Sequence, residues 1–339
     1  MEFFGLDIGS RNIKAVQLKK TGADQYQLVT SGSAPSTIKG LSSEAESDLT
    51  SLAETIKKLC QEAKITTKNV AAAIPEDQVF SRVVTFPKLS EEELTSALKW
   101  EAEQWVPIPL EEVSLAHQVL GEIHQDGQEK LEVFLVAAPN RVIEKILLVL
   151  KTAGLTSVSL ETEILAMGRS LITAKAEPTL LVDLGAKATD LAIVEAGQVI
   201  FSRSIPTAGE AMTRAIASSL GLEIAQAEEY KKAYGVDAEK LEGKVSQAIE
   251  PVLEVVIKEM EQAMQFYQQG KGKVTKRVVL TGGTAILPAA VSKIAKKLML
   301  EVQIGDPFGK INQDALIAKI PPNDRPFYAV AVGLAMKEL

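Results

Sequence analysis

A short sequence pattern near the N-terminus recurs in the middle of the chain. Residues 6–18 read Leu-Asp-Ile-Gly-Ser-Arg-Asn-Ile-Lys-Ala-Val-Gln-Leu, and residues 182–194 read Val-Asp-Leu-Gly-Ala-Lys-Ala-Thr-Asp-Leu-Ala-Ile-Val. In each copy an apolar strand ends in Asp-x-Gly, turns through polar residues and continues into a second apolar strand. Because a further strand and then helices follow each copy, the repeat predicts a duplicated α/β fold with two facing lobes.

The periodicity of apolar residues predicts the elements around both copies. The first copy begins a meander with strands over 3–8, 13–18 and 26–31, followed by a helix over 47–63 and strands over 70–74 and 80–85. The second copy is followed by a strand over 197–204, helices over 210–220, 224–234 and 245–268, a strand over 277–280 and a terminal helix over 327–339. The regular part of the helix over 245–268 is expected to begin near Pro251.

An additional α+β unit separates the two halves of the first lobe, over residues 88–160. It is predicted to contain a helix over 91–103, begun by a capping box between Ser90 and Glu93. Strands over 114–122 and 130–137 flank the hairpin signal Gln-Asp-Gly-Gln at 125–128. A helix over 141–152, a strand over 157–160 and then a helix over 163–173 complete this half of the chain.

Composition excludes several classes of protein. The net charge is −7 and the basic residues are dispersed, which argues against nucleic-acid binding. Cys60 is the single cysteine, so an intrachain disulfide is excluded, and we expect it to pack in a core. The longest apolar runs, 146–150 and 329–336, are too short to span a bilayer. We therefore expect a soluble cytoplasmic protein that reaches a membrane only through partners.

The first Asp-x-Gly turn carries residue types suited to a phosphate and a cation. Gly9 allows a phosphate to approach the backbone, and Ser10 adds a hydroxyl. Asp7 can hold Mg²⁺ through water, and Lys14 follows on the next strand. A single turn of this kind is more often only conformational. The second copy, at Asp183, shifts the balance toward a clamp for the two ends of a triphosphate.

Two further segments fit the same interpretation. Residues 279–285, Val-Leu-Thr-Gly-Gly-Thr-Ala, predict a strand, a glycine turn and a helix N-terminus, whose N–H groups favour an anion or the edge of a nucleotide. Residues 227–235 place Glu228 and Lys231 on one helix. On its own, this helix is better explained by a solvated charged face.

Taken in order, these four segments are similar to the nucleotide-binding motifs of the actin superfamily. The two turns resemble its phosphate motifs, 281–285 its adenosine motif, and 227–235 the helix beside adenine and ribose. Within that superfamily the chain resembles the PilM family of type IV pilus assembly proteins, with the division protein FtsA as the nearest relative. The insertion and the segment 100–113, Trp-Glu-Ala-Glu-Gln-Trp-Val-Pro-Ile-Pro-Leu-Glu-Glu-Val, carry this resemblance, which covers essentially the whole chain.

The resemblance implies a duplicated actin-like (ribonuclease H-like) two-lobed fold with an inserted α+β subdomain. It assigns 1–87, 161–181 and 325–339 to the first-lobe core, 88–160 to the inserted partner-binding subdomain, 182–208 and 275–324 to the second-lobe core, and 209–274 to a helical subdomain. FtsA-like proteins end in an amphipathic membrane helix, and related type II secretion proteins carry a transmembrane helix. The chain stops after its small-residue helix, so pilus assembly is the expected role.

The resemblance also implies ATP and Mg²⁺ as ligands. The residues expected to bind nucleotide are Gly9, Ser10, Arg11, Lys14, Gly185, Ala186, Lys187, Gly209, Glu228, Lys231, Gly282, Gly283 and Thr284. Asp7 and Asp183 are expected to hold the metal, mostly through water. Glu163 falls where relatives orient the attacking water, although a first-turn carboxylate explains it equally well. The second turn, Gly-Ala-Lys-Ala at 185–188, is poorer in glycine than in strong ATPases, so we expect slow hydrolysis at most.

The expected partner is the N-terminal cytoplasmic tail of PilN, in a groove between the insertion and the first lobe. Other pilus platform proteins and the pilus motor ATPases are further expected partners, at the inner face of the cytoplasmic membrane. Trp100 and Trp105 both fall in the insertion, and Trp100 in particular is expected to be a core residue. The alternatives are an FtsA-like nucleotide-dependent filament or division protein and, less favoured, a small-molecule kinase of the same superfamily.

Overall fold

The first lobe is built on a five-stranded sheet. The computed structural model describes residues 1–22, 24–125, 127–312 and 315–338. The sheet has the order β3-β2-β1-β4-β8, formed by β1 (Phe4–Ile8), β2 (Asn12–Gly22), β3 (Gln25–Pro35), β4 (Asn69–Ile74) and β8 (Thr156–Thr162). β1, β2 and β3 are antiparallel, and β4 and β8 continue the sheet in parallel with β1.

The second lobe repeats this plan. Its five-stranded sheet has the order β11-β10-β9-β12-β13, formed by β9 (Thr179–Leu184), β10 (Thr189–Glu195), β11 (Gln198–Ile205), β12 (Arg277–Thr281) and β13 (Glu301–Ile304). Asp7 lies opposite Lys14 in the first sheet, and Asp183 lies opposite Asp190 at the equivalent place in the second. The predicted duplicated α/β fold with two lobes is confirmed.

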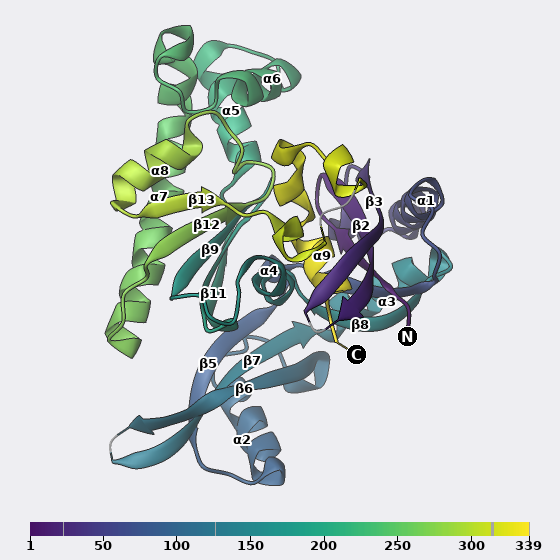
Figure 1. The fold of residues 1–339 in the computed structure, drawn as a ribbon, viewed down its shortest axis with the longest axis vertical. Helices are drawn as coiled ribbons and strands as arrows, with labels where there is room; N and C mark the ends of the chain where they lie inside the picture. Colours follow the sequence, from purple (N-terminus) through teal and green to yellow (C-terminus); the bar gives the residue numbers. More distant parts are fainter. Residues whose placement is uncertain (23, 126, 313–314, 339) are drawn as a thin grey trace.

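Helices cover the sheets and fill the space between them (Figure 1). The first lobe carries α1 (Glu46–Glu62), α3 (Asn140–Thr152), α4 (Glu163–Leu171) and α9 (Ala329–Ala335); the second carries α5 (Gly209–Leu220), α6 (Ile224–Tyr234), α7 (Lys244–Lys271) and α8 (Ala290–Leu298). α4 and α9 lie between the two sheets, and a Cβ on Gly333 would collide with the Ala166 carbonyl. The close packing expected of the small-residue helix is therefore confirmed.

Several boundaries differ from the sequence prediction, among them those of α9, α4 and α7. α9 ends at Ala335, Leu339 lies outside the described residues, and α4 ends at Leu171 rather than at residue 173. α7 begins at Lys244, so Pro251 lies inside it. Its buried stripe, which includes Val245 and Ile249, starts before the proline, and burial of that stripe stabilises the first turns.

The insertion is a three-stranded sheet with one helix. Its strands have the order β5-β7-β6, formed by β5 (Phe80–Pro87), β6 (Val113–Gln125) and β7 (Gln128–Pro139), and α2 (Glu91–Glu103) packs on them. The capping box of Ser90 and Glu93 is present. β6 and β7 form the predicted hairpin, although Asp126 in its turn lies outside the described residues.

Not every element of the range 88–160 belongs to the insertion. Conversely, β5 ends at Pro87, before this range, yet it pairs with β7 of the insertion. β8 pairs with β4 of the first lobe, and α3 packs into the first-lobe core through Val142 and Ile146. The division of the chain into four subdomains stays a prediction.

The insertion also touches the second lobe. Glu132 on β7 forms an ion pair with Lys271 at the end of α7, and the hydroxyls of Ser81 and Ser202 lie 2.5 Å apart. A movement of the second lobe can therefore reach the insertion through direct contacts.

Cys60 packs at the edge of the first-lobe core, where burial raises the pKa of its thiol to about 11. It therefore behaves as an inert packing residue, as predicted. Within the ranges that the structure describes, no helix combines the length and hydrophobicity needed to cross a bilayer.

Candidate functional site

A cleft of about 480 Å³ lies between the two lobes. The turns after β1, β9 and β12 meet there, together with the N-terminus of α4 and residues of α5 and α6. The cleft brings together all the predicted site residues except Gly209: Asp7, Gly9, Ser10, Arg11, Lys14, Glu163, Asp183, Gly185, Ala186, Lys187, Glu228, Lys231, Gly282, Gly283 and Thr284. Gly209 lies directly beneath, with its N–H donating to the Gly185 carbonyl at 3.2 Å.

The two aspartates expected to hold a metal each present a free oxygen. Asp7 accepts from Lys14 Nζ through Oδ2 at 2.8 Å, and its Oδ1 is buried without a hydrogen-bond partner. Asp183 Oδ1 is likewise buried and unpartnered. Burial raises the pKa of Asp183 to about 6, although Lys14 opposes this. Such oxygens fit a cation, because an unpaired buried carboxylate is otherwise unfavourable.

The arrangement suits a hydrated cation better than one enclosed by protein ligands. Among the described residues, no group of three or more His, Cys, Asp or Glu side chains is placed to hold a metal directly. Mg²⁺ usually keeps several waters and takes one or two carboxylates together with phosphate oxygens. Asp7 and Asp183 therefore fit a Mg²⁺ ion bound mostly through water.

The geometry of both tight turns requires glycine at one position. A Cβ on Gly9 would lie 2.8 Å from the Asn12 carbonyl, and one on Gly185 would lie 2.7 Å from the Ala188 carbonyl. These two glycines occupy equivalent places in the repeat and form equivalent tight turns. The backbone of each turn therefore stays open to an anion.

The third glycine turn is docked on the second. Gly282 has φ +85°, and a Cβ there would collide with Asp183 Oδ1. Thr284 donates its hydroxyl to the Gly185 carbonyl at 2.9 Å and its N–H to Leu184 at 2.9 Å. The turn after β12 and the turn after β9 therefore form one connected surface.

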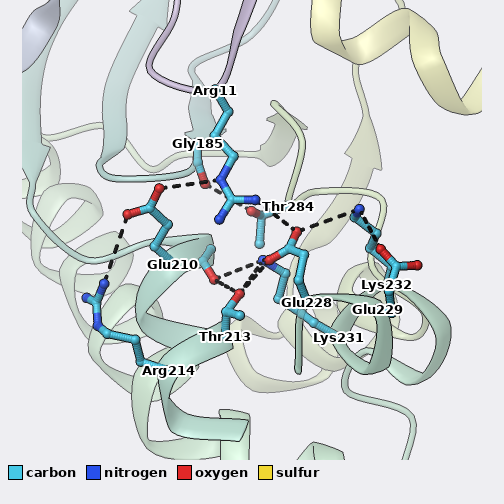
Figure 2. Close-up of polar contacts among 11 residues, drawn as sticks. Arg11, Gly185, Glu210, Thr213, Arg214, Glu228, Glu229, Lys231, Lys232 and Thr284 are labelled. Carbon is cyan, nitrogen blue, oxygen red and sulfur yellow. Dashed lines mark hydrogen bonds and ion pairs between the residues drawn. The ribbon is translucent and has the colours of Figure 1, made fainter. Parts of the chain in front are cut away.

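Lys231 is held inside the protein by a compact network on α5 and α6 (Figure 2). Its Nζ donates to the Gly209 carbonyl and the Thr213 hydroxyl at 2.9 Å each, and to Glu228 Oε2 at 2.8 Å. An ammonium has three N–H groups, so all of them are engaged. Burial lowers the pKa of Lys231, although Glu228 opposes this. In this arrangement Lys231 fixes the position of Glu228, and a direct contact of Lys231 with nucleotide stays a prediction.

Glu163 starts α4 and belongs to a buried group of carboxylates. Its Oε2 accepts the backbone N–H of Glu76 at 3.0 Å. Burial raises the pKa of Glu163 well above its usual range, and the charges of Asp190 and Asp7 raise it further. Asp190 is also buried, and burial together with Asp183 raises its pKa. These carboxyls favour protonation unless a cation joins them.

Some residues of the site are absent from the sequence prediction. Glu210 and Thr213 on α5 and Glu76 before β5 contact predicted site residues. Glu210 and Glu76 contact partners 199 and 87 positions away, whereas Thr213 contacts Glu228, 15 positions away. Asp190 belongs to the second copy of the repeat and lies opposite Asp183, where the first copy has Lys14 opposite Asp7.

The insertion carries a second cavity and an exposed aromatic side chain. The cavity, about 620 Å³, lies between α2 and β6. Trp100 is 63% exposed, so its expected place in the core is wrong; Trp105 packs against the insertion core instead. α2 buries a stripe of Leu94, Leu98 and Ala102, and Trp100 lies off that stripe. A peptide groove between the insertion and the first lobe stays a prediction.

A family model and one solved structure indicate the same family. A family model described as type IV pilus assembly protein PilM matches residues 5–339. A solved structure of a PilM–PilN type IV pilus biogenesis complex is similar at a TM-score of 0.85 and 27% identity, covering 99% of this chain and 98% of that chain. Ethanolamine utilization protein EutJ from Carboxydothermus hydrogenoformans shares the fold at a TM-score of 0.59 and 17% identity, covering 98% of this chain and 88% of its own.

Curated relatives include cell division proteins. FtsA of Pseudomonas aeruginosa is 25% identical over 375 residues, covering 98% of this chain and 88% of FtsA. FtsA of Escherichia coli K12 is 24% identical over 382 residues, covering 97% of this chain and 88% of FtsA. The family match spans nearly the whole chain and agrees with the more similar of the two solved structures. The chain belongs to the PilM family of type IV pilus assembly proteins.

Proposed function

We propose that this protein is an ATP-binding adaptor of the type IV pilus assembly platform that grips the N-terminal tail of PilN. The observation that carries the proposal is the likeness to the PilM–PilN complex, which extends over 99% of this chain at a TM-score of 0.85. The family assignment favours this role over the division-type and small-molecule kinase alternatives.

The cleft between the lobes is the proposed nucleotide site. The backbone of the turns at Gly9 and Gly185 would hold phosphates, with Lys14 beside them. Asp7 and Asp183 would hold Mg²⁺ through water, using the oxygens that have no partner. The ion would neutralise charge on the phosphates and on the neighbouring carboxylates. Glu228, held by Lys231, would face the sugar.

Slow hydrolysis is the second part of the proposal. The second turn carries side chains at Ala186, Lys187 and Ala188, where glycines would leave the γ-phosphate more accessible. Glu163 accepts a backbone N–H, and its raised pKa favours the protonated carboxyl, which cannot take a proton from water. The nucleotide would then hold the lobes in one conformation rather than drive repeated turnover.

The proposed location is the cytoplasmic face of the inner membrane. The described residues contain no helix that could span a bilayer, so contact with the membrane would come through PilN. Other platform proteins and the motor ATPases are further proposed partners. The insertion touches the second lobe through Lys271 and Ser202, which gives nucleotide a route to the partner surface.

A peptide-binding assay tests the adaptor role. A fluorescent peptide of the PilN tail is titrated with the protein, alone and with Mg²⁺-ATP, and its anisotropy is compared with that of a scrambled peptide. We expect saturable binding that changes in strength with nucleotide. No binding in either condition would overturn the adaptor, and equal binding in both would overturn the regulatory role. Rapid ATP turnover that Asp183→Ala abolishes would contradict slow hydrolysis.

A further inference from the structure

One side chain of the first lobe reaches across the cleft to the second lobe. Arg11 lies in the turn between β1 and β2, and its Nε is 3.4 Å from Glu210 Oε1 on α5. Its guanidinium also lies 3.6 Å from Glu228 Oε1 on α6. Figure 2 shows Arg11 pointing between these two carboxylates. The pairs join residues about 200 positions apart in the chain, 199 for Arg11 and Glu210.

The second lobe holds Glu228 in place through its side chain and Glu210 through its backbone. Glu228 Oε2 accepts from Thr213 at 2.6 Å and from Lys231 at 2.8 Å, which leaves Oε1 directed toward Arg11. Glu210 lies in the first turn of α5, where its backbone N–H donates to the Ala186 carbonyl at 2.8 Å. Arg11 therefore meets one carboxylate that is held by hydrogen bonds and a second one whose backbone is anchored.

Other cations near these carboxylates come from the second lobe. Arg214 lies 4.0 Å from Glu210 on the same helix, and Lys232 lies 3.9 Å from Glu228 on its own helix. Neither can join the lobes, because each sits on the same lobe as its acceptor. Among these contacts, the pairs of Arg11 are the ones that must break when the lobes separate.

We propose that Arg11 is a latch that fastens the two lobes over the nucleotide cleft and limits the rate of nucleotide exchange. This rests on the nucleotide site proposed above, since Gly9 and Ser10 of the same turn are expected to hold phosphate. The Arg11 side chain is 42% exposed, so its pairs are partly solvated and individually weak. Such weak ion pairs can break and re-form each time the lobes open for nucleotide exchange.

Exchange kinetics of a fluorescent ATP analogue test the latch. Association and dissociation of N-methylanthraniloyl-ATP with Mg²⁺ are followed by stopped flow. Arg11→Ala should raise both rates by roughly three- to tenfold, while Kd changes less than either rate. Arg214→Ala is the matched control, since it removes a cation from Glu210 without touching the link between lobes, and its rates should equal those of the unaltered protein.

A second variant separates a latch from a plain phosphate ligand. Glu210→Gln removes the negative charge of one latch acceptor, so it should also raise both rates, and adding Arg11→Ala should give little further increase. If Arg11 only bound phosphate, Glu210→Gln would slow dissociation, and Arg11→Ala would raise Kd without raising the association rate. That result, or unchanged rates in Arg11→Ala, overturns the latch and leaves nucleotide binding intact. If the unaltered protein does not bind the ATP analogue, both proposals are overturned. This measurement is made before any variant is tested.

Discussion

Lys14 on β2 and Asp7 on β1 lie opposite each other and form an ion pair, with Lys14 Nζ 2.8 Å from Asp7 Oδ2. The equivalent place in the second copy puts Asp190 opposite Asp183, so a carboxylate replaces the ammonium. Burial opposes charge on Lys14, yet the facing carboxylates of Asp7 and Asp183 raise its pKa. The first copy therefore neutralises its aspartate within the hairpin, whereas the second leaves negative charge for a cation to neutralise.

Asp183→Asn should stabilise the protein in EDTA and abolish the effect of Mg²⁺ on nucleotide binding. Burial raises the pKa of Asp183 from 3.8 to about 6, so above pH 6 the folded protein carries a buried charge that costs it more than it costs the unfolded chain. Removing that charge should raise the free energy of unfolding at pH 8 by about 1–3 kcal/mol. Urea unfolding in EDTA measures the gain.

The same variant should gain little further stability from Mg²⁺-ATP, whereas the unaltered protein should gain substantially. Melting temperatures with EDTA, with Mg²⁺ and with Mg²⁺-ATP make the comparison. A variant that is less stable than the unaltered protein in EDTA would show that Asp183 has a structural partner there.

Glu76 should make stability depend on pH near neutrality. Burial raises the pKa of Glu76 from 4.5 to about 7. Between these values the folded protein keeps a proton that the unfolded chain has lost, so stability falls as pH rises from about 4.5 to 7 and stays lower above. Glu76→Gln should therefore flatten the profile and be more stable at pH 8 by roughly 2 kcal/mol.

Urea unfolding at pH 5, 6, 7 and 8 makes this measurement. Glu54→Gln, at an exposed position of α1, is the control and should leave the profile unchanged. Parallel profiles for Glu76→Gln and the unaltered protein would show that the Glu76 carboxyl is not the titrating group.

The sequence predicts the parts of the site that local patterns encode. The repeat places Asp7 and Asp183 at the ends of central strands, because apolar alternation and an Asp-x-Gly turn are local signals. The exposure of Trp100 could also be predicted from the sequence, because Leu94, Leu98 and Ala102 define the buried face of α2 without it. A large aromatic side chain such as Trp100 is often buried, but the helical period places it off the buried face of α2.

Other features depend on contacts that no local pattern contains. β8 pairs in parallel with β4 across a long connection, so the sequence placed it in the insertion. Arg11 meets Glu210 only because the two lobes face each other. Glu76 reaches Glu163 through a backbone N–H, a donor that every residue except proline carries. Such contacts follow from the tertiary arrangement, which a repeat predicts only in outline.

Lys231→Met should destabilise the protein strongly, and Lys232→Met should not. Loss of the Lys231 ammonium leaves the Gly209 carbonyl without this donor and Glu228 without its buried counter-ion. Breaking such a pair costs about 3 kcal/mol or more. Lys232 is exposed, so its replacement should change the free energy of unfolding by less than about 0.5 kcal/mol.

A double variant checks the cause. Lys231→Met combined with Glu228→Met should be more stable than Lys231→Met alone, because both charges are then removed. Urea unfolding of the single and double variants gives the comparison. Equal or greater destabilisation in the double variant would contradict the role of Lys231 as the counter-ion that fixes Glu228.

Gly282→Ala should damage the site through shape alone, without changing any charge. Gly282 has φ +85°, and an added Cβ would collide with the buried Asp183 Oδ1. The strain and the displaced carboxylate should lower the free energy of unfolding by roughly 2–4 kcal/mol and weaken Mg²⁺-dependent nucleotide binding. Gly270→Ala, near the end of α7 with no atom within 4 Å of the new Cβ, should instead stabilise the protein by about 0.5–1 kcal/mol. Opposite signs for the same chemical change would show that the turn after β12 is built around Asp183, and equal effects would contradict it.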